Sequence, residues 1–191
     1  MRAQNGRVPA DICMNLDIRW LAPVALVALS PHCIAARYMS VEQARTLIFP
    51  LADEFVAKPI QLTPEQMQEI ERLSGVPGRT AQQDVWQVLS QGKMIGWFFI
   101  DQVVGKHELI TYALGLNADG SVRQFQIVEY LEAYGYQVRE LKWRDQFVGK
   151  TADSPLRVGT DIGNISGATL SVRHITNGIK RLLFLCQTVL R

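Results

Sequence analysis

Four consecutive segments rich in β-branched and aromatic residues constrain this chain more than any other feature of its sequence. They cover residues 84–90, 94–104, 108–117 and 121–131, and such a composition favours β-strands. The dipeptide Gln91-Gly92 is expected to turn the first strand into the second, and the tetrapeptide 117–120 the third into the fourth. Within that tetrapeptide, Gly120 is free to take a positive φ. The sequence therefore predicts an antiparallel meander over about residues 85–131.

Two helices are predicted ahead of the meander, because both have start and stop signals. Ser40 and Gln43 have the spacing of a capping box at the start of the first helix, and Pro50 would end it. Thr63 caps the second helix in the same way, and Gly75 ends it. A third, short amphipathic helix is expected over residues 139–149.

In that short helix Leu141, Trp143 and Phe147 are expected to point inward, and Gly149 to stop it. The last segment of the chain has apolar residues at spacings of three and four, which predicts one buried face of a long helix. This face comprises Val172, Ile175, Ile179, Leu182, Leu183, Cys186 and Leu190. The opposite face is expected to carry Arg173, Lys180 and Arg181. Helices flanking a twisted antiparallel sheet, with a long C-terminal helix, make an α+β domain.

The first 36 residues differ from the rest of the chain. Arg19 precedes an apolar run over 20–29, and small residues follow up to Ala35 and Ala36. This pattern is typical of a secretory signal peptide cleaved after Ala35 or Ala36, with Met14 as a possible true start. The alternative is an uncleaved apolar N-terminal segment that anchors or packs. In either case residues 37–191 are interpreted as one domain.

Composition excludes two kinds of partner. The net charge is +2 and the chain has no block of like charges, so no basic stripe for a nucleic acid is expected. Outside the signal-like segment the remaining cysteine is Cys186, which is expected in the core. His107 and His174 lie far apart in the sequence, so no metal site is expected. His107, at a strand entrance, is interpreted as structural.

The segment that begins the C-terminal helix is rich in small residues. Ser166 is the natural N-cap, Gly167 lets the backbone approach a neighbour closely, and Ala168 leaves room. Thr169 falls in the first turn, where unpaired N–H groups and the helix dipole stabilise an anion such as a phosphate. The residues alone leave two interpretations open: a capped helix, or a phosphate site.

The run from Ser166 to Ser171, with Asp161 ahead of it, resembles the SGAT signature of the FMN-binding domain family. This family includes the periplasmic flavin subunits of the sodium-translocating NADH:quinone reductase and of the Rnf complex. In it, a dedicated transferase esterifies the FMN phosphate onto the threonine that ends the motif, which is Thr169 here. The aspartate usually found three residues before the serine is replaced by Gly163.

Two further segments are similar to the family. Residues 129–138 resemble a segment with a glutamate and a Gly-containing loop, and residues 141–150 resemble a helix with Trp and Phe. The resemblance implies FMN as cofactor and places Tyr134 and Trp143 near its ring. It also implies the following set of cofactor-binding residues: Glu132, Asp161, Asn164, Ser166, Gly167, Ala168, Thr169 and Ser171.

The resemblance implies a periplasmic flavoprotein that carries electrons and has no substrate of its own. Its partners would be the flavin transferase and a membrane-bound redox protein, and association with the membrane stays open. Two other functions remain as alternatives. One is an FMN-dependent reductase of a small molecule, which would need an acid near the ring. The other is a non-redox binding module in which SGAT only caps the helix.

Overall fold

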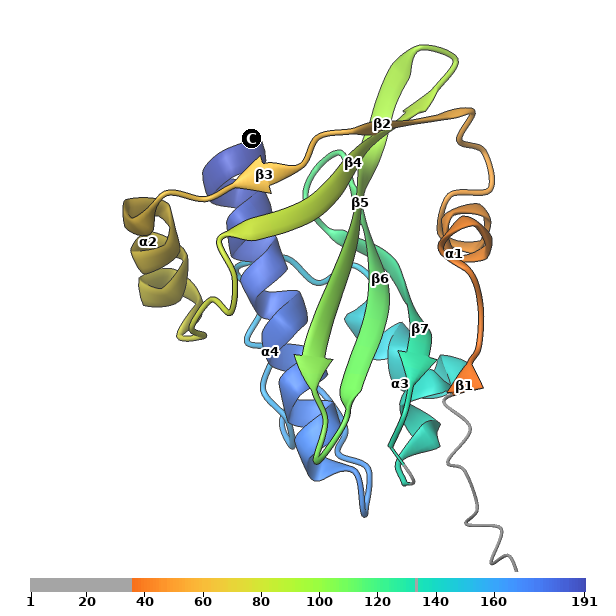
Figure 1. Ribbon diagram of the computed structural model, residues 1–191, viewed down its shortest axis with the longest axis vertical. Coiled ribbons are helices and arrows are strands. Elements are labelled where there is room, and N and C mark those ends of the chain that lie inside the picture. Colours follow the sequence, from red (N-terminus) through yellow and green to blue (C-terminus); the bar gives the residue numbers. More distant parts are fainter. Residues whose placement is uncertain (1–35, 133) are drawn as a thin grey trace, which may run out of the picture. The chain divides into compact units, whose positions relative to one another are not determined.

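The computed structural model describes residues 36–132 and 134–191, and an antiparallel sheet lies at the centre of this part (Figure 1). The strand order is β1-β7-β6-β5-β4-β2, with β3 paired to β4 off this path. The strands are β1 (Ala36–Arg37), β2 (Glu54–Ala57), β3 (Ile60–Gln61), β4 (Gln82–Ser90), β5 (Lys93–Val104), β6 (Leu109–Asn117) and β7 (Val122–Tyr130). The helices are α1 (Val41–Ile48), α2 (Pro64–Ser74), α3 (Leu141–Arg144) and α4 (Thr169–Leu185). The predicted α+β class, with a long C-terminal helix, is confirmed.

The predicted meander is confirmed as β4 to β7, in which each strand pairs antiparallel with the next. Gln91 and Gly92 both have positive φ, 50° and 72°, which suits the right-handed twist of a two-residue hairpin. Gly120 turns β6 into β7 with φ 83°. The pattern missed β1, β2 and β3, because strands of two to four residues are too short for alternation to be visible.

Both predicted N-terminal helices are confirmed, together with their caps. The Ser40 hydroxyl accepts a hydrogen bond from the Gln43 N–H, and the Gln43 side chain accepts one from the Ser40 N–H. Thr63 forms the same reciprocal pair at the start of α2. Helix α2 then ends at Gly75, which takes the left-handed conformation with φ 69°.

The prediction of one amphipathic helix over residues 139–149 is wrong. This segment forms a 3-10 turn (Tyr136–Arg139), the single-turn α3 and a second 3-10 turn (Asp145–Phe147). Trp143 and Phe147 are buried as expected, but the Leu141 side chain is 59% exposed. Positions two apart point to opposite sides of a helix, so Leu141 and Trp143 cannot both face the core.

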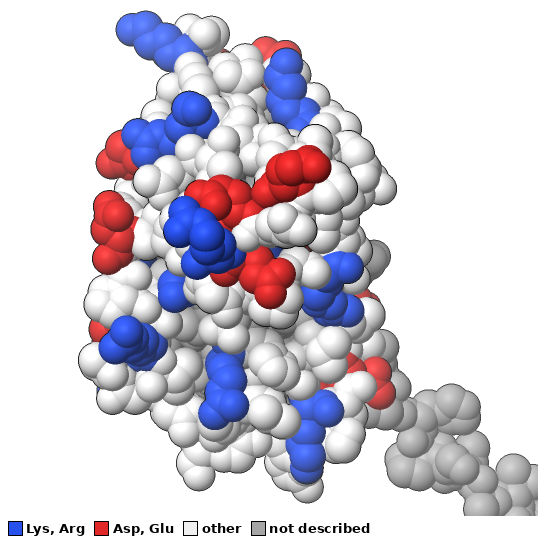
Figure 2. All heavy atoms as spheres, turned by 90° about the vertical axis from the view of Figure 1, so that its left-hand side faces the viewer, with Lys and Arg blue, Asp and Glu red and all other residues white. Residues whose placement is uncertain are grey.

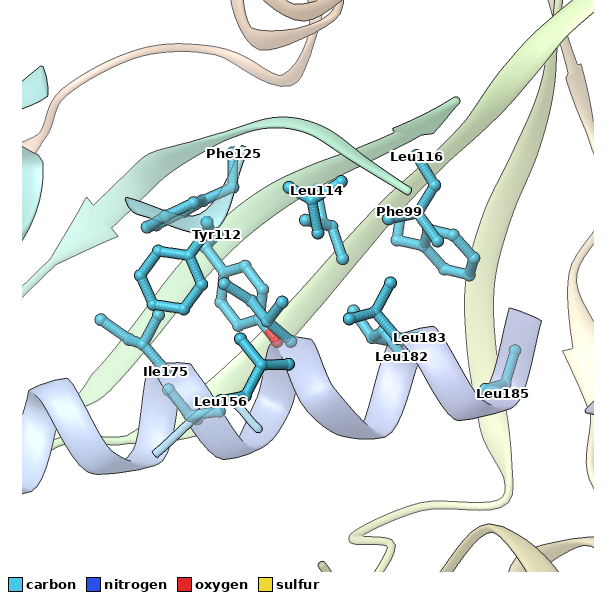
Figure 3. Close-up of a cluster of buried hydrophobic side chains, with 14 of the residues drawn as sticks. Phe99, Tyr112, Leu114, Leu116, Phe125, Leu156, Ile175, Leu182, Leu183 and Leu185 are labelled. Carbon is cyan, nitrogen blue, oxygen red and sulfur yellow. The ribbon is translucent and has the colours of Figure 1, made fainter. Parts of the chain in front are cut away.

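Alternation along the strands separates two hydrophobic layers. Phe98 packs in the cluster beneath α1, whereas its neighbour Phe99 packs in the larger cluster against α4. Figure 1 shows α1 on one side of the sheet and α4 with α2 on the other. Figure 3 shows side chains of β5, β6 and β7 directed at those of α4, among them Tyr112 and Phe125. This packing holds α4 and therefore its N-terminus in place.

The predicted apolar face of the C-terminal helix is confirmed with one exception and one correction, and its last two residues lie in a π-helical turn (Cys186–Leu190) that continues α4. All seven predicted residues pack in the α4 cluster, with Leu190 only partly buried. Cys186 is buried, as expected. Arg181, however, is not on the solvent face: it is 8% exposed and forms an ion pair with Asp101 at 2.9 Å. The helical pattern could not reveal this, because the partner lies on a distant strand.

Candidate functional site

Helix α4 begins at Thr169, and its N-cap is Ala168 rather than the predicted Ser166. The Ala168 N–H donates to the Ile165 carbonyl at 3.0 Å, and Gly167 takes φ +80°, so a turn separates Ser166 from the helix. No side-chain hydrogen bond caps this end of α4. The backbone N–H groups of the first turn are therefore not bonded by a capping side chain and can donate to an anion. The positive end of the helix dipole would stabilise the same anion.

The Thr169 hydroxyl lies at the surface of this helix end. Thr169 is exposed, and the Asn164 side-chain amide donates a hydrogen bond to its Oγ1 at 3.2 Å. Asn164 is itself exposed, so the pair stands on the outside of the molecule. The structure thus brings two of the predicted site residues together, one of them orienting the hydroxyl of the other.

Open space adjoins this hydroxyl. A Cβ on Gly167 would have no other heavy atom within 4 Å, and Ser166 is exposed beside it. On the other side of Thr169, Leu170 is 40% exposed although it is apolar. The surface beside Thr169 is therefore open at Gly167 and partly apolar at Leu170.

The side of the SGAT segment (residues 166–171) that faces the sheet is tightly packed. A Cβ on Gly135 would stand 2.4 Å from the Ala168 Cβ, so Gly135 packs directly against the Ala168 methyl group. Ser171 is buried, and its hydroxyl lies 3.3 Å from the Tyr130 hydroxyl. Tyr130 also donates to the Tyr134 carbonyl at 2.5 Å. Ser171 thus joins the helix to the sheet, and its hydroxyl does not face the open space.

Exposed aromatic side chains flank the glycine that touches Ala168. Tyr134 is 79% exposed and Tyr136 is 60% exposed. Tyr136 was missed by the sequence reasoning, although the Tyr-Gly-Tyr spacing was visible. Trp143 is buried, and its Nε1 donates to the Gly163 carbonyl at 2.7 Å. Trp143 therefore fixes the backbone just ahead of the SGAT segment.

Asp161 organises the loop ahead of SGAT. Its carboxylate accepts from the Arg157 and Leu156 N–H groups at 2.6 and 3.1 Å and pairs with the Lys150 Nζ at 3.0 Å. Burial raises the pKa of Asp161, but these hydrogen bonds and the lysine charge outweigh it and keep the pKa below its ordinary value. These partners do not include Thr169, whose hydroxyl accepts a hydrogen bond from Asn164.

Glu132 holds the tip of the β5–β6 hairpin. Its Oε1 accepts from the His107 and Glu108 N–H groups at 2.6 and 3.0 Å. Partial burial raises the pKa of Glu132, and the backbone donors outweigh this effect, so the pKa lies below its ordinary value. Gly105 packs against the same carboxylate. The Glu132 carboxylate is therefore ionised and already hydrogen-bonded to the hairpin. His107 contributes its backbone N–H to these bonds.

Gly163 occupies the position where the family usually has an aspartate. Its N–H donates to the Gln146 Oε1 at 2.6 Å, and its carbonyl accepts from Trp143. A Cβ at this position would stand 3.1 Å from the same Gln146 oxygen. An aspartate here would therefore require Gln146 to move.

The charged surface has no single sign on the face that carries α2. Figure 2 shows Lys and Arg interspersed with Asp and Glu on this face. Within residues 36–132 and 134–191, no group of three His, Cys, Asp or Glu side chains is arranged to hold a metal ion. In the same described ranges, none of the helices has the length and apolar character needed to cross a membrane.

Comparison with known proteins finds a family match for part of the chain. Residues 105–183 match the model of the FMN-binding domain family, and the resemblance of the SGAT segment to this family is thereby confirmed. The fold is similar to the crystal structure of NqrC from Shewanella oneidensis, at 15% identity and a TM-score of 0.47. That similarity covers 74% of this chain and 73% of NqrC. No curated protein matches the chain in sequence.

Proposed function

We propose that this protein, whose residues 105–183 match the FMN-binding domain family, carries electrons on an FMN esterified through its phosphate to Thr169. One observation carries the proposal. The Thr169 hydroxyl is exposed at the first residue of a 17-residue helix whose N-terminus no side chain caps. A phosphoester at this oxygen would keep a negative charge beside the unpaired N–H groups, where the helix dipole stabilises it.

The residues around Thr169 have separable roles in this proposal. Asn164 orients the hydroxyl oxygen, and Gly167 leaves space next to it. Tyr134 and Tyr136 present exposed aromatic rings on either side of Gly135, and a flat aromatic group packs well on such rings. FMN, when bound, supplies the reversible redox chemistry of its isoalloxazine ring.

The carboxylates favour an electron carrier over a reductase with a substrate of its own. A reductase that protonates its product would need an acid near the ring. Asp161 and Glu132, the two acidic residues predicted for the site, each accept two backbone N–H bonds and have lowered pKa values. Both are therefore held as anions and are poor proton donors at neutral pH.

The geometry also disfavours the view that SGAT only caps the helix. Ser166, the residue that would provide the cap, is separated from α4 by a turn and makes no capping hydrogen bond. The small residues of this segment serve instead to bring Ala168 against Gly135 and to leave the surface beside Thr169 open.

Attachment is tested by co-expressing the chain with a flavin transferase and measuring flavin fluorescence of the denatured protein band. The Thr169→Ala variant should lose all covalent flavin, because the oxygen that bonds to phosphorus is gone. Thr169→Ser should retain part of it. Thr46→Ala, which removes an exposed threonine hydroxyl on α1 outside the site, is the matched control and should stay as fluorescent as the parent, with an intact mass that includes FMN.

A fluorescent Thr169→Ala band would place the attachment on another hydroxyl. A dark parent band from a yellow native protein would instead mean that FMN is held without a covalent bond. In that case Gly163, in place of the usual aspartate, is the first position to change.

We also propose that the protein is exported to the periplasm, with the transferase and a membrane-bound redox protein as partners. The signal-like pattern that supports this lies in residues 1–36, almost all outside the described part of the chain. N-terminal sequencing of the periplasmic protein should begin at Ala36 or Arg37. A start upstream of Trp20 in that fraction would overturn the proposal of a cleaved signal.

A further inference from the structure

Two arginine side chains are buried to the same extent in this fold but differ in their ion pairing. Arg144 of α3 and Arg181 of α4 are each 8% exposed. Arg181 forms its ion pair with Asp101 at 2.9 Å. No carboxylate of residues 36–132 and 134–191 lies within 4.0 Å of an Arg144 nitrogen. Because buried charges in proteins are generally paired, Arg144 lacks a counter-charge that its burial calls for.

The Arg144 guanidinium makes all its hydrogen bonds to uncharged oxygens. Its Nε donates to the Arg139 carbonyl at 2.9 Å. Its Nη1 donates to the Phe125 carbonyl at 2.7 Å and to the Gln126 Oε1 at 2.6 Å. The third nitrogen, Nη2, donates to no group in the described part of the chain and is not fully enclosed. Two N–H donors of a buried cation are therefore open to a ligand.

A second guanidinium lies beside the first. Arg139 is exposed, and its Cζ lies 3.3 Å from the centroid of the Tyr38 ring. The Tyr38 N–H donates to the Val128 carbonyl of β7 at 3.0 Å, and Arg144 contacts the same strand through Phe125. Figure 1 shows α3 and β1 at the same end of β7. Among the described residues Arg139, like Arg144, forms no ion pair.

The acidic side chains nearest in the sequence do not balance these two charges. Asp145 and Glu140 are exposed, and neither forms an ion pair with an arginine of the described ranges. Burial lowers the pKa of Arg144, the Asp145 carboxylate raises it and the charge of Arg139 lowers it again, so that the pKa lies below its ordinary value. Arginine stays protonated at neutral pH all the same. Two positive charges therefore meet beside β7.

We propose that Arg139 and Arg144 bind a phosphate group, with the Arg144 Nη2 and the Arg139 guanidinium as donors. Guanidinium groups match phosphate oxygens in both geometry and charge. A phosphate monoester carries about −1.5 to −2 charges at pH 7, which balances both arginines, whereas one carboxylate would balance only one. Two sources have this chemistry: phosphate in solution and the headgroup of an anionic lipid. The inference does not depend on flavin at Thr169.

The first experiment titrates inorganic phosphate into the full-length chain at an ionic strength held constant with sodium chloride. Phosphate should raise the unfolding temperature saturably, because a ligand that binds only the folded chain stabilises it. It should also shift the Nε–H NMR resonance of Arg144. The Nε–H resonance of Arg181, whose charge is already paired, is the internal reference and should stay in place. Equal shifts of the two resonances would indicate a general salt effect and overturn the proposal.

Vesicles distinguish the two sources of phosphate. If the ligand is a lipid headgroup, the chain should co-sediment with phosphatidylcholine vesicles that contain phosphatidic acid and much less with phosphatidylcholine alone. Binding of inorganic phosphate without that difference assigns the site to phosphate in solution. Binding to neither probe overturns the proposal.

Removing the exposed arginine tests the site without disturbing the core. Arg139→Gln keeps the backbone carbonyl to which the Arg144 Nε donates, so the buried hydrogen bonds remain. It should weaken phosphate binding about tenfold, the value of one good hydrogen bond to a charged group. Arg72→Gln, which removes an exposed arginine paired with Glu69, is the matched control and should bind as the parent does. Equal affinities of the two variants would contradict the proposal.

Gln126→Glu supplies the missing counter-charge from within the chain, at nearly constant shape. Gln126 is 5% exposed and already accepts from Arg144, so the variant should unfold at a higher temperature in phosphate-free buffer and bind phosphate about tenfold more weakly. Gln83→Glu is the contrast, because Gln83 accepts from Arg181, which already has Asp101. It should unfold at a lower temperature and keep the parent's phosphate affinity. A destabilised Gln126→Glu variant, or one that binds phosphate like the parent, would show that Arg144 needs no anion.

Discussion

Gly135 and Ala168 touch so closely that a Cβ on Gly135 would stand 2.4 Å from the Ala168 Cβ. Gly135 also has φ +88°, a conformation that strains other L-residues. This single contact joins the loop after β7 to the residue that precedes Thr169. The position of the candidate attachment site therefore depends on a residue far from it in the sequence.

Gly135→Ala should accordingly lower the free energy of unfolding by about 1–3 kcal/mol, through both the positive φ and the overlap with Ala168. It should also reduce flavin attachment at Thr169, since the SGAT segment must shift. Gly149→Ala is the matched control, because Gly149 has φ +77° but nothing within 4 Å of a Cβ. Chemical denaturation and band fluorescence of both variants check this. Equal attachment in the two variants would mean that the contact does not position Thr169.

Arg181→Leu should destabilise the fold by about 3 kcal/mol, because it removes the charged partner of the mostly buried Asp101 carboxylate and leaves it only the Tyr112 hydroxyl as a donor. The side chains of the pair are only 9% and 13% exposed. Arg72→Leu removes a pair whose side chains are 67% and 42% exposed, and should cost less than about 1 kcal/mol. Urea denaturation of the two variants compares these losses. Similar losses would show that burial does not distinguish the two ion pairs.

Asp161→Asn should lower stability at neutral pH and have little effect in acid. The pKa of Asp161 is lower in the folded chain than its ordinary value of about 4, so the carboxylate stabilises the fold above that pH. This contribution is lost as the pH falls through the folded value. The difference in unfolding free energy between parent and variant should thus shrink below about pH 4. Asp153→Asn, an exposed change in the same loop, is the control. A difference that is constant across the acid range would exclude this role for the carboxylate.

Cys186 should not react with thiol reagents in the folded protein. Burial raises the pKa of its thiol to about 11, so almost no thiolate forms at pH 8. A variant with Cys13 and Cys33 replaced by serine isolates this thiol. Ellman titration at pH 8 should detect no thiol in the native protein and one after denaturation. Fast native reaction would mean that this end of α4 opens readily.

Much of the fold follows from local signals in the sequence. The strands β4 to β7 follow from their composition, and their turns from Gly92 and Gly120. The ends of α1 and α2 follow from capping residues within a few positions of each helix start. The likeness of the SGAT run to its family was also readable, because the motif is contiguous. All of these features depend on residues close together in the chain.

Two of the errors share one physical cause, which is contact between residues distant in the sequence. Ser166 matches the pattern of an N-cap, but packing of Ala168 on Gly135 moves the start of α4 to Thr169. Arg181 fits the polar face of its helix, and only the distant Asp101 explains its burial. The sequence by itself determined the strands β4 to β7, the helices α1, α2 and α4, and which hydroxyls stand near the start of α4. Tertiary packing decided which of those hydroxyls faces solvent, because it buries Ser171 against Tyr130 and leaves Thr169 open.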